Sequence, residues 1–147
     1  MSDITQVTNN SNNQVVNYGT SKFAIGNNEF EQGEYTSTDA IVITEGTVFG
    51  RIAATGKLAI LSYDAADGSK YPVGAMYNGI SGSLSVGAAT TVTITLVTKG
   101  KIDSSKLSFA SDTTISSLVD NQQLKDLLAG RGLILETCTQ LAAVDNQ

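Results

Sequence analysis

Residues 40–109 consist of short apolar runs, each bounded by glycine or by small polar residues. The clearest run, TTVTITLVTKG at 90–100, alternates: Val92, Ile94 and Leu96 share one face, and threonines share the other. Short strands that recur at intervals of about eight to twelve residues are typical of a compact barrel or sandwich. The chain is therefore expected to be mainly β, as a small β-barrel-like or β-sandwich-like domain.

Further strands are expected on both sides of this run. Residues 40–44 form an apolar stretch closed by Gly46, and KLAILSYD at 57–64 is a second run of strand length. The next residues, AADGSKYPVGAMY, predict a hairpin with its turn at Asp67–Gly68. KIDSSKLSF at 101–109 predicts one more strand. The glycine-rich apolar segments 46–61 and 73–80 are expected to need cover from a second subunit.

One short helix is expected near the C-terminal end, over about residues 117–129. Ser116 or Ser117 can cap its start, and Gly130 can end it. An i, i+3, i+4 apolar stripe on this helix is expected to pack on the β body as part of its core. The stripe consists of Leu124, Leu127 and Leu128. GLILET at 132–137 then predicts a closing strand.

The first 28 residues differ from the rest, because they are rich in Asn, Gln, Ser and Thr with only short apolar islands. We expect residues 1–28 to be an extended N-terminal arm and residues 29–147 to be a single β-rich domain. Two interpretations stay open for the arm: a disordered tail, or a segment that orders on a partner. In the second, the anchors would be Val15, Val16, Tyr18, Phe23 and Ile25.

The charge pattern excludes two classes of partner. The net charge is −5, and the nine basic residues are scattered singly, whereas nucleic-acid binding needs a clustered basic face. The same charge disfavours an anionic membrane surface, and no apolar run approaches the ~20 residues of a membrane span. With no signal peptide visible, the chain is expected to be made in a cytoplasm. Cys138 is the single cysteine and is expected to be a small half-buried residue near a strand end.

Catalytic and metal-binding residue patterns are missing from the sequence. Without histidine there is no Ser-His or Cys-His relay, and Glu29, Glu31 and Glu34 lie in a segment too polar to raise a carboxyl pKa. DAADG at 64–68 lacks the ligands of a calcium loop and is expected to be a hairpin turn. GISGSLSVG at 79–87 lacks the ending of a phosphate loop and is expected to be a flexible loop. We therefore expect no enzymatic activity, no cofactor and no metal.

The segment GTVFGRIAATGKLAILSYDAADGSKYPVGAMYNG, followed by VTITLVTKGKIDSSKLSF, resembles the lambda D-like head decoration proteins of tailed bacteriophages. The resemblance is carried by four stretches and by LVDNQQLKDLLAGRGLILE, a helix-then-strand ending of longer members. The four stretches are Gly46–Gly50, Thr55–Lys57, Pro72–Met76, and Val92–Gly100 through Leu107. It covers roughly residues 30–137, and residues 1–28 have no motif that can be aligned with the family.

This resemblance implies a capsid decoration, or cement, protein. Such a protein would be a homotrimer over the local three-fold axes of the expanded head. It would lie on the outer surface of the virion and hold neighbouring major capsid protein subunits together.

Two other functions are compatible with the sequence. A carbohydrate-binding or adhesin module would stack sugars on exposed aromatics, for which Tyr35, Tyr63, Tyr71 and Tyr77 are candidates. Trp is absent, however, and aromatics make up only 6% of the residues. A tail-tube or fibre fragment is the other alternative, and it would form larger rings or fibres rather than compact trimers.

Overall fold

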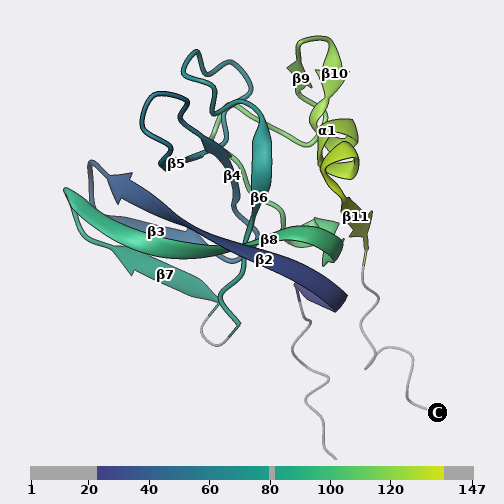
Figure 1. Ribbon diagram of the computed structural model, residues 1–147, viewed down its shortest axis with the longest axis horizontal. Helices are drawn as coiled ribbons and strands as arrows, with labels where there is room; N and C mark the ends of the chain where they lie inside the picture. The colour runs from purple at the N-terminus through teal and green to yellow at the C-terminus, as the bar shows by residue number, and fades with distance from the viewer. Residues whose placement is uncertain (1–22, 80–81, 138–147) are drawn as a thin grey trace, which may run out of the picture. The chain divides into compact units, whose positions relative to one another are not determined.

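Two 14-residue strands, β2 (Ala24–Ser37) and β8 (Thr90–Asp103), pair antiparallel along nearly their whole length (Figure 1). The computed structural model describes residues 23–79 and 82–137. The pairing begins with Ala24 opposite Ile102 and ends with Ser37 opposite Thr90, with an irregularity in register around Glu29. This ribbon forms one wall of the domain, and the remaining strands are arranged around it.

Three shorter strands close the ribbon into a five-stranded barrel. They are β4 (Val48–Arg51), β5 (Leu58–Ile60) and β6 (Pro72–Met76). The hydrogen-bonded order runs from β8 to β2, β5, β4 and β6, and β6 pairs back to β8. Because the barrel is closed, each of these five strands pairs with a neighbour on both sides, and none is an edge strand of the sheet. The expectation of a mainly β, barrel-like domain is therefore confirmed.

The barrel interior holds the first of two hydrophobic cores. Ile94 and Leu96 of β8 are fully buried in it, while Thr91 and Thr93 are exposed, which confirms the alternation expected for this strand. Tyr35 packs edge-on against Phe49, with ring centroids 5.5 Å apart. A two-stranded ribbon adds Ile43 and Val86 to the same core. It pairs β3 (Ile41–Thr44) with β7 (Ser83–Val86).

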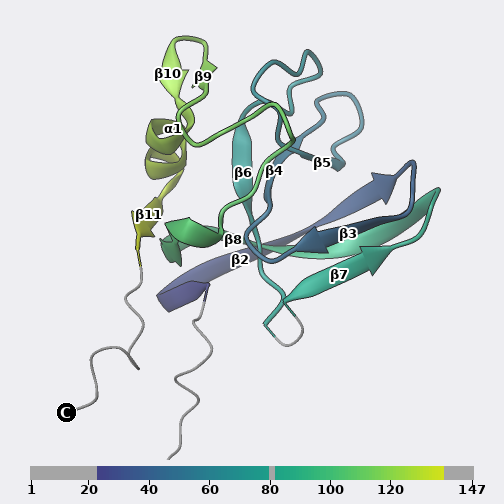
Figure 2. The same cartoon turned by 180° about the vertical axis from the view of Figure 1, so that it is seen from behind.

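The second core lies between the barrel wall and a C-terminal lobe (Figure 2). The lobe contains a 3-10 turn η1 (Ser104–Lys106), a hairpin of β9 (Leu118–Val119) and β10 (Gln122–Gln123), the helix α1 (Leu124–Arg131) and the strand β11 (Leu133–Glu136). Val48, Ala75 and Val97 supply the wall. Leu124 and Leu128 of the expected stripe are fully buried against it, and Leu127 is half-buried beside them.

The helix is shorter than expected and begins later. Residues 118–123 form a hairpin instead of the first helical turns, with Asp120 and Asn121 in the tight turn at φ 51° and 70°. Two consecutive positive φ values are characteristic of a type I′ hairpin turn, which Asp and Asn tolerate. At the other end, Gly132 at φ 112° is the left-handed C-cap, so Gly130, which lies inside the helix, was the wrong stop.

Three strand predictions were wrong. Residues 58–76 do not form one hairpin, because β5 and β6 lie on opposite sides of β4 and each pairs with it. Residues 101–109 are not a separate strand, since β8 continues to Asp103 and η1 follows. Residues 83–86, expected to be a loop, form β7 and pair with β3. Pairing between distant strands decided all three outcomes, and local pattern alone does not carry that information.

Gly50, in the middle of β4, shows why the GTVFG stretch needs a glycine at its end. A Cβ atom at this position would lie 1.9 Å from the carbonyl oxygen of Ser69. No side chain fits at that distance from backbone, so the loop after β5 can cross β4 only over a glycine. The sequence therefore has a glycine at the position where the Ser69 backbone crosses β4.

The boundary between arm and domain lies earlier than expected. Residues 24–28 belong to β2 rather than to an arm, and Ala24 and Ile25 pair with Ile102 and Lys101. Phe23 is 1% exposed and lies in the second core. Its burial inside the domain offsets the entropy cost of ordering this segment. The domain therefore includes residues 23–28. The interval up to 22, with Val15, Val16 and Tyr18, lies outside the described residues, as does Cys138.

The large apolar side chains of segments 46–61 and 73–80 differ in how far one copy of the chain covers them. Val48, Phe49, Leu58 and Met76 are buried within one copy of the chain, whereas Ile52 and Ile60 are half-buried, Tyr77 is 37% exposed, and Ile80 lies outside the described residues. For the four buried side chains, cover from a second subunit is not needed, because the barrel and the lobe supply it.

A polar cluster ties the β9–β10 hairpin to the loop before β6. Asp120 Oδ1 lies 2.9 Å from Lys70 Nζ, and its Oδ2 accepts a hydrogen bond from the Tyr71 hydroxyl. The hydrogen bonds from Tyr71 and then Lys70 hold the pKa of Asp120 below its ordinary value of 3.8. The same contacts raise the pKa of Tyr71 and of Lys70, with the hydrogen bond to Asp120 as the main cause in each.

We expect Leu128→Ala to reduce the free energy of unfolding by about 2–5 kcal/mol, because it leaves a cavity in the second core. Leu127→Ala should cost less, since Leu127 is only half-buried. Urea denaturation followed by circular dichroism measures both. Lys125→Ala, exposed on the same helix, is the control and should stay within about 0.5 kcal/mol of the parent. A Leu128→Ala midpoint equal to that control would contradict the assignment of the second core.

Asp120→Asn is expected to speed amide hydrogen exchange in residues 118–123 at neutral pH, because the ionised acceptor of Lys70 is lost. In the parent chain, the Asp120 contribution is complete above pH 3.8 and disappears as pH falls through the lowered folded-state pKa. The Tyr71 and Lys70 contributions are complete below their ordinary pKa values and disappear as pH rises through the raised ones. Asp39→Asn, in the turn after β2, is the control, and equal exchange in both variants would refute the assignment.

Candidate functional site

Both ends of the described domain meet at the last residues of β8. The Asp103 amide donates to the carbonyl of Phe23 at 2.9 Å, and Ser104 Oγ lies 3.5 Å from Thr137 Oγ1. This arrangement arises because β2 pairs with one edge of β8 while β11 runs parallel along the other. The segments that precede Phe23 and follow Thr137 are therefore attached at one end of the domain.

The expected arm anchors fall into two groups. Phe23 cannot be a capsid anchor, because its side chain is buried in the second core. Ile25 is half-buried within β2, where it pairs with Lys101. Val15, Val16 and Tyr18 lie outside the described residues. The partner-binding role thus remains a proposal for Val15, Val16, Tyr18 and the half-buried Ile25, and is withdrawn for the buried Phe23.

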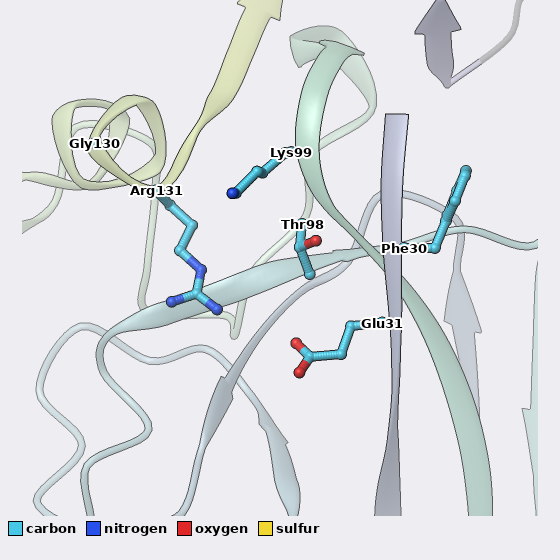
Figure 3. A pocket seen from close by; sticks show the side chains of 6 residues that line it. All are labelled: Phe30, Glu31, Thr98, Lys99, Gly130 and Arg131. Carbon is cyan, nitrogen blue, oxygen red and sulfur yellow. The ribbon is translucent and has the colours of Figure 1, made fainter. Parts of the chain in front are cut away.

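A shallow hollow of about 510 Å³ lies where β2, β8 and the end of α1 meet (Figure 3). Its lining is mainly polar and charged, and consists of Phe30, Glu31, Thr98, Lys99, Gly130 and Arg131. Arg131 extends over the hollow toward Glu31, while Phe30 projects from the opposite side of β2 (Figure 3). The hollow is therefore a surface for polar contacts, and the Phe30 side chain lies on the other side of β2 from Arg131.

Charges around the hollow are only partly compensated. Arg51 lies 3.8 Å from Glu31, and Lys99 lies 3.8 Å from Glu29. Pairs of this length between exposed side chains contribute little to stability. Arg131 donates through Nε to the carbonyl of Val73 at 3.2 Å, and no carboxylate pairs with it in the part of the chain that the structure describes. The fixed Nε leaves both terminal nitrogens of the guanidinium available.

The tyrosines considered for sugar stacking do not form one platform. Tyr35 is inside the barrel, and the Tyr71 hydroxyl is bound to Asp120. Tyr77 packs against Phe30, with ring centroids 5.2 Å apart, and Tyr63 lies elsewhere, on the loop after β5. Phe30 and Tyr77 are instead a small exposed aromatic pair beside the hollow.

The acidic residues considered for catalysis lie along β2 with exposed side chains. Glu29 and Glu31 face different cations, as described above, and Glu34 is exposed on the same strand. Across residues 23–79 and 82–137, no three His, Cys, Asp or Glu side chains gather closely enough to hold a metal ion. The same residues include no helix long and apolar enough to cross a membrane.

The hollow was not predicted from the sequence. Lys99 and Arg131 are 32 positions apart, and nothing in the local pattern indicates that they meet. The available signal was the resemblance itself, in which a helix-then-strand ending follows the long strand. Placing the closing strand beside β8 would have brought the end of the helix next to Lys99.

Comparison with known families gives one match. The family model of bacteriophage lambda head decoration protein D matches residues 9–129, which includes the barrel, the hairpin and most of α1. No curated protein sequence matches the chain. The family is a structural component of phage capsids, and its model covers most of the chain. The chain therefore belongs to the bacteriophage lambda head decoration protein D family.

Proposed function

We propose that three copies of this chain assemble over each local three-fold axis of the expanded phage head and cement neighbouring major capsid protein subunits. Family membership supports association with the capsid. The trimer, its site and the cementing role follow from the resemblance to lambda D-like proteins. The chain would be made in the host cytoplasm and added to the outer surface of the head.

The observation that carries the proposal is the shared attachment point of both ends of the domain. Because Phe23 and Thr137 lie beside Asp103 and Ser104, the 22 residues before Phe23 start from the same end as the residues after Thr137. We propose that this end faces the capsid. Contacts from several chains of one trimer would then be concentrated at one place on the head.

An extended arm would enlarge the contact well beyond the footprint of the domain. Twenty-two residues can span at most about 70–80 Å, at ~3.3–3.6 Å per residue. Val15, Val16 and Tyr18 would supply apolar anchors, and the backbone between them could add a strand to an exposed capsid sheet. Binding would have to offset the entropy of ordering the arm.

We expect removal of residues 1–22 to leave folding and trimer formation intact and to weaken attachment to expanded heads at least about tenfold. The truncation has to stop before Phe23, since removing residues 1–25 would open the second core. Co-sedimentation with heads purified without the decoration protein measures attachment. Unchanged binding of the truncated protein would show that the arm is not a capsid-binding segment.

A matched pair of full-length variants separates anchoring from charge. Val15→Asp/Val16→Asp places two carboxylates on the proposed anchors, whereas Asn12→Asp/Asn13→Asp places two in the stretch without apolar residues. The first variant should lose attachment and the second should retain most of it. Equal loss in both would mean that only charge was being measured, and the anchor assignment would be wrong.

A further inference from the structure

Two surfaces of the domain carry charges that are only partly compensated within the described residues. One is the hollow with Lys99 and Arg131, described above. The other is a corner where the loop after β5 meets the connection from η1 to β9, which crosses the face seen in Figure 2. We name the second surface the acidic corner and define it by Ser62, Tyr63, Asp64 and Asp112.

The acidic corner holds two carboxylates around one hydroxyl. Ser62 Oγ lies 2.8 Å from Asp64 Oδ1 and 3.2 Å from each carboxylate oxygen of Asp112. A hydroxyl has a single hydrogen to donate, so it cannot serve both carboxylates at once. Neither Asp64 nor Asp112 forms an ion pair within residues 23–79 and 82–137. Asp112 Oδ1 also accepts a hydrogen bond from Thr113 Oγ1 at 2.8 Å, so two hydroxyls and no cation among the described residues compensate these two like charges.

The hollow presents the complementary donors. Since Arg131 Nε is bound to the Val73 carbonyl, the guanidinium is held in place and its two terminal nitrogens form a fork suited to a carboxylate. Lys99 adds a second cation, and its 3.8 Å pair with Glu29 is exposed and easily exchanged. Phe30, on the other side of β2, and Tyr63, next to Asp64 in the sequence, are both exposed, and aromatic side chains of this kind commonly anchor interfaces.

We propose that the acidic corner of one copy of this chain docks into the hollow of a second copy, with Asp64 and Asp112 on Arg131 and Lys99. This inference rests on the proposed trimer and identifies its subunit contact. The occupant is a second copy because a chain of net charge −5 repels itself over most of its surface, and these two patches are complementary. A contact between two different patches is heterologous, and three such contacts can close a ring.

Charge reversal on each side tests the contact. Lys99→Glu/Arg131→Glu and Asp64→Lys/Asp112→Lys should each raise the dissociation constant of the trimer by about a hundredfold or more, because like charges would then face each other. The four-fold variant combines both pairs, keeps the net charge of −5 and should restore the trimer. Lys101→Glu/Lys125→Glu changes the charge by the same amount outside the hollow and should remain a trimer. Melting by circular dichroism confirms that each variant is folded.

Sedimentation velocity measures assembly in solution. Carbodiimide coupling of mixed isotope-labelled and unlabelled copies, in solution and on heads, should link Lys99 of one copy to Asp64 or Asp112 of another. If the wild-type protein is a trimer and both charge-reversal variants are trimers as well, this contact is wrong. A four-fold variant that is folded but monomeric would also overturn the contact. Either result would leave the proposed function standing. A wild-type protein that never trimerises, in solution or on heads, would overturn both the contact and the trimer.

Discussion

The pairing of β2 with β8 is the interaction on which the rest of the structure depends. β8 pairs with β2 along one edge. The other edge of β8 pairs with β6 at Val97 and with β11 from Gly100 to Asp103. Barrel closure, attachment of the C-terminal lobe and the position of Phe23 all follow from these shared edges. A strand with so many partners can also bury both of its faces, as Leu96 and Val97 show by lying in different cores.

The candidate surfaces are consequences of the same strand. Its last residues bring Phe23 and Thr137 together, so that segments from both ends of the sequence leave one end of the domain. A few residues earlier, Lys99 lies beside the end of α1 and completes the hollow with Arg131. The capsid-facing end and the subunit contact are therefore proposed for surfaces that one strand positions.

Much of the barrel could be predicted from local pattern, and much of its pairing could not. The alternation of Val92, Ile94 and Leu96 marks a half-buried strand without outside information. The 14 residues of β2 gave no such signal, because they are rich in Glu and Asn, and among their described side chains only those of Tyr35 and Ser37 are buried. Their strand conformation depends on pairing with β8. Asp120 and Asn121 were predicted to lie in a helix, because Asp and Asn are common both near helix starts and in tight hairpin turns. Their positive φ values place them in a turn. The hollow needed residues 32 positions apart, which only tertiary packing brings together.

Electron cryomicroscopy of expanded heads, reconstructed with and without the purified protein, tests whether this member of the family decorates phage heads as a trimer. We expect added density over the local three-fold axes, with the end of the domain that holds Phe23 and Thr137 against the capsid. Heads that show no added density, or density formed by isolated copies away from these axes, would contradict it.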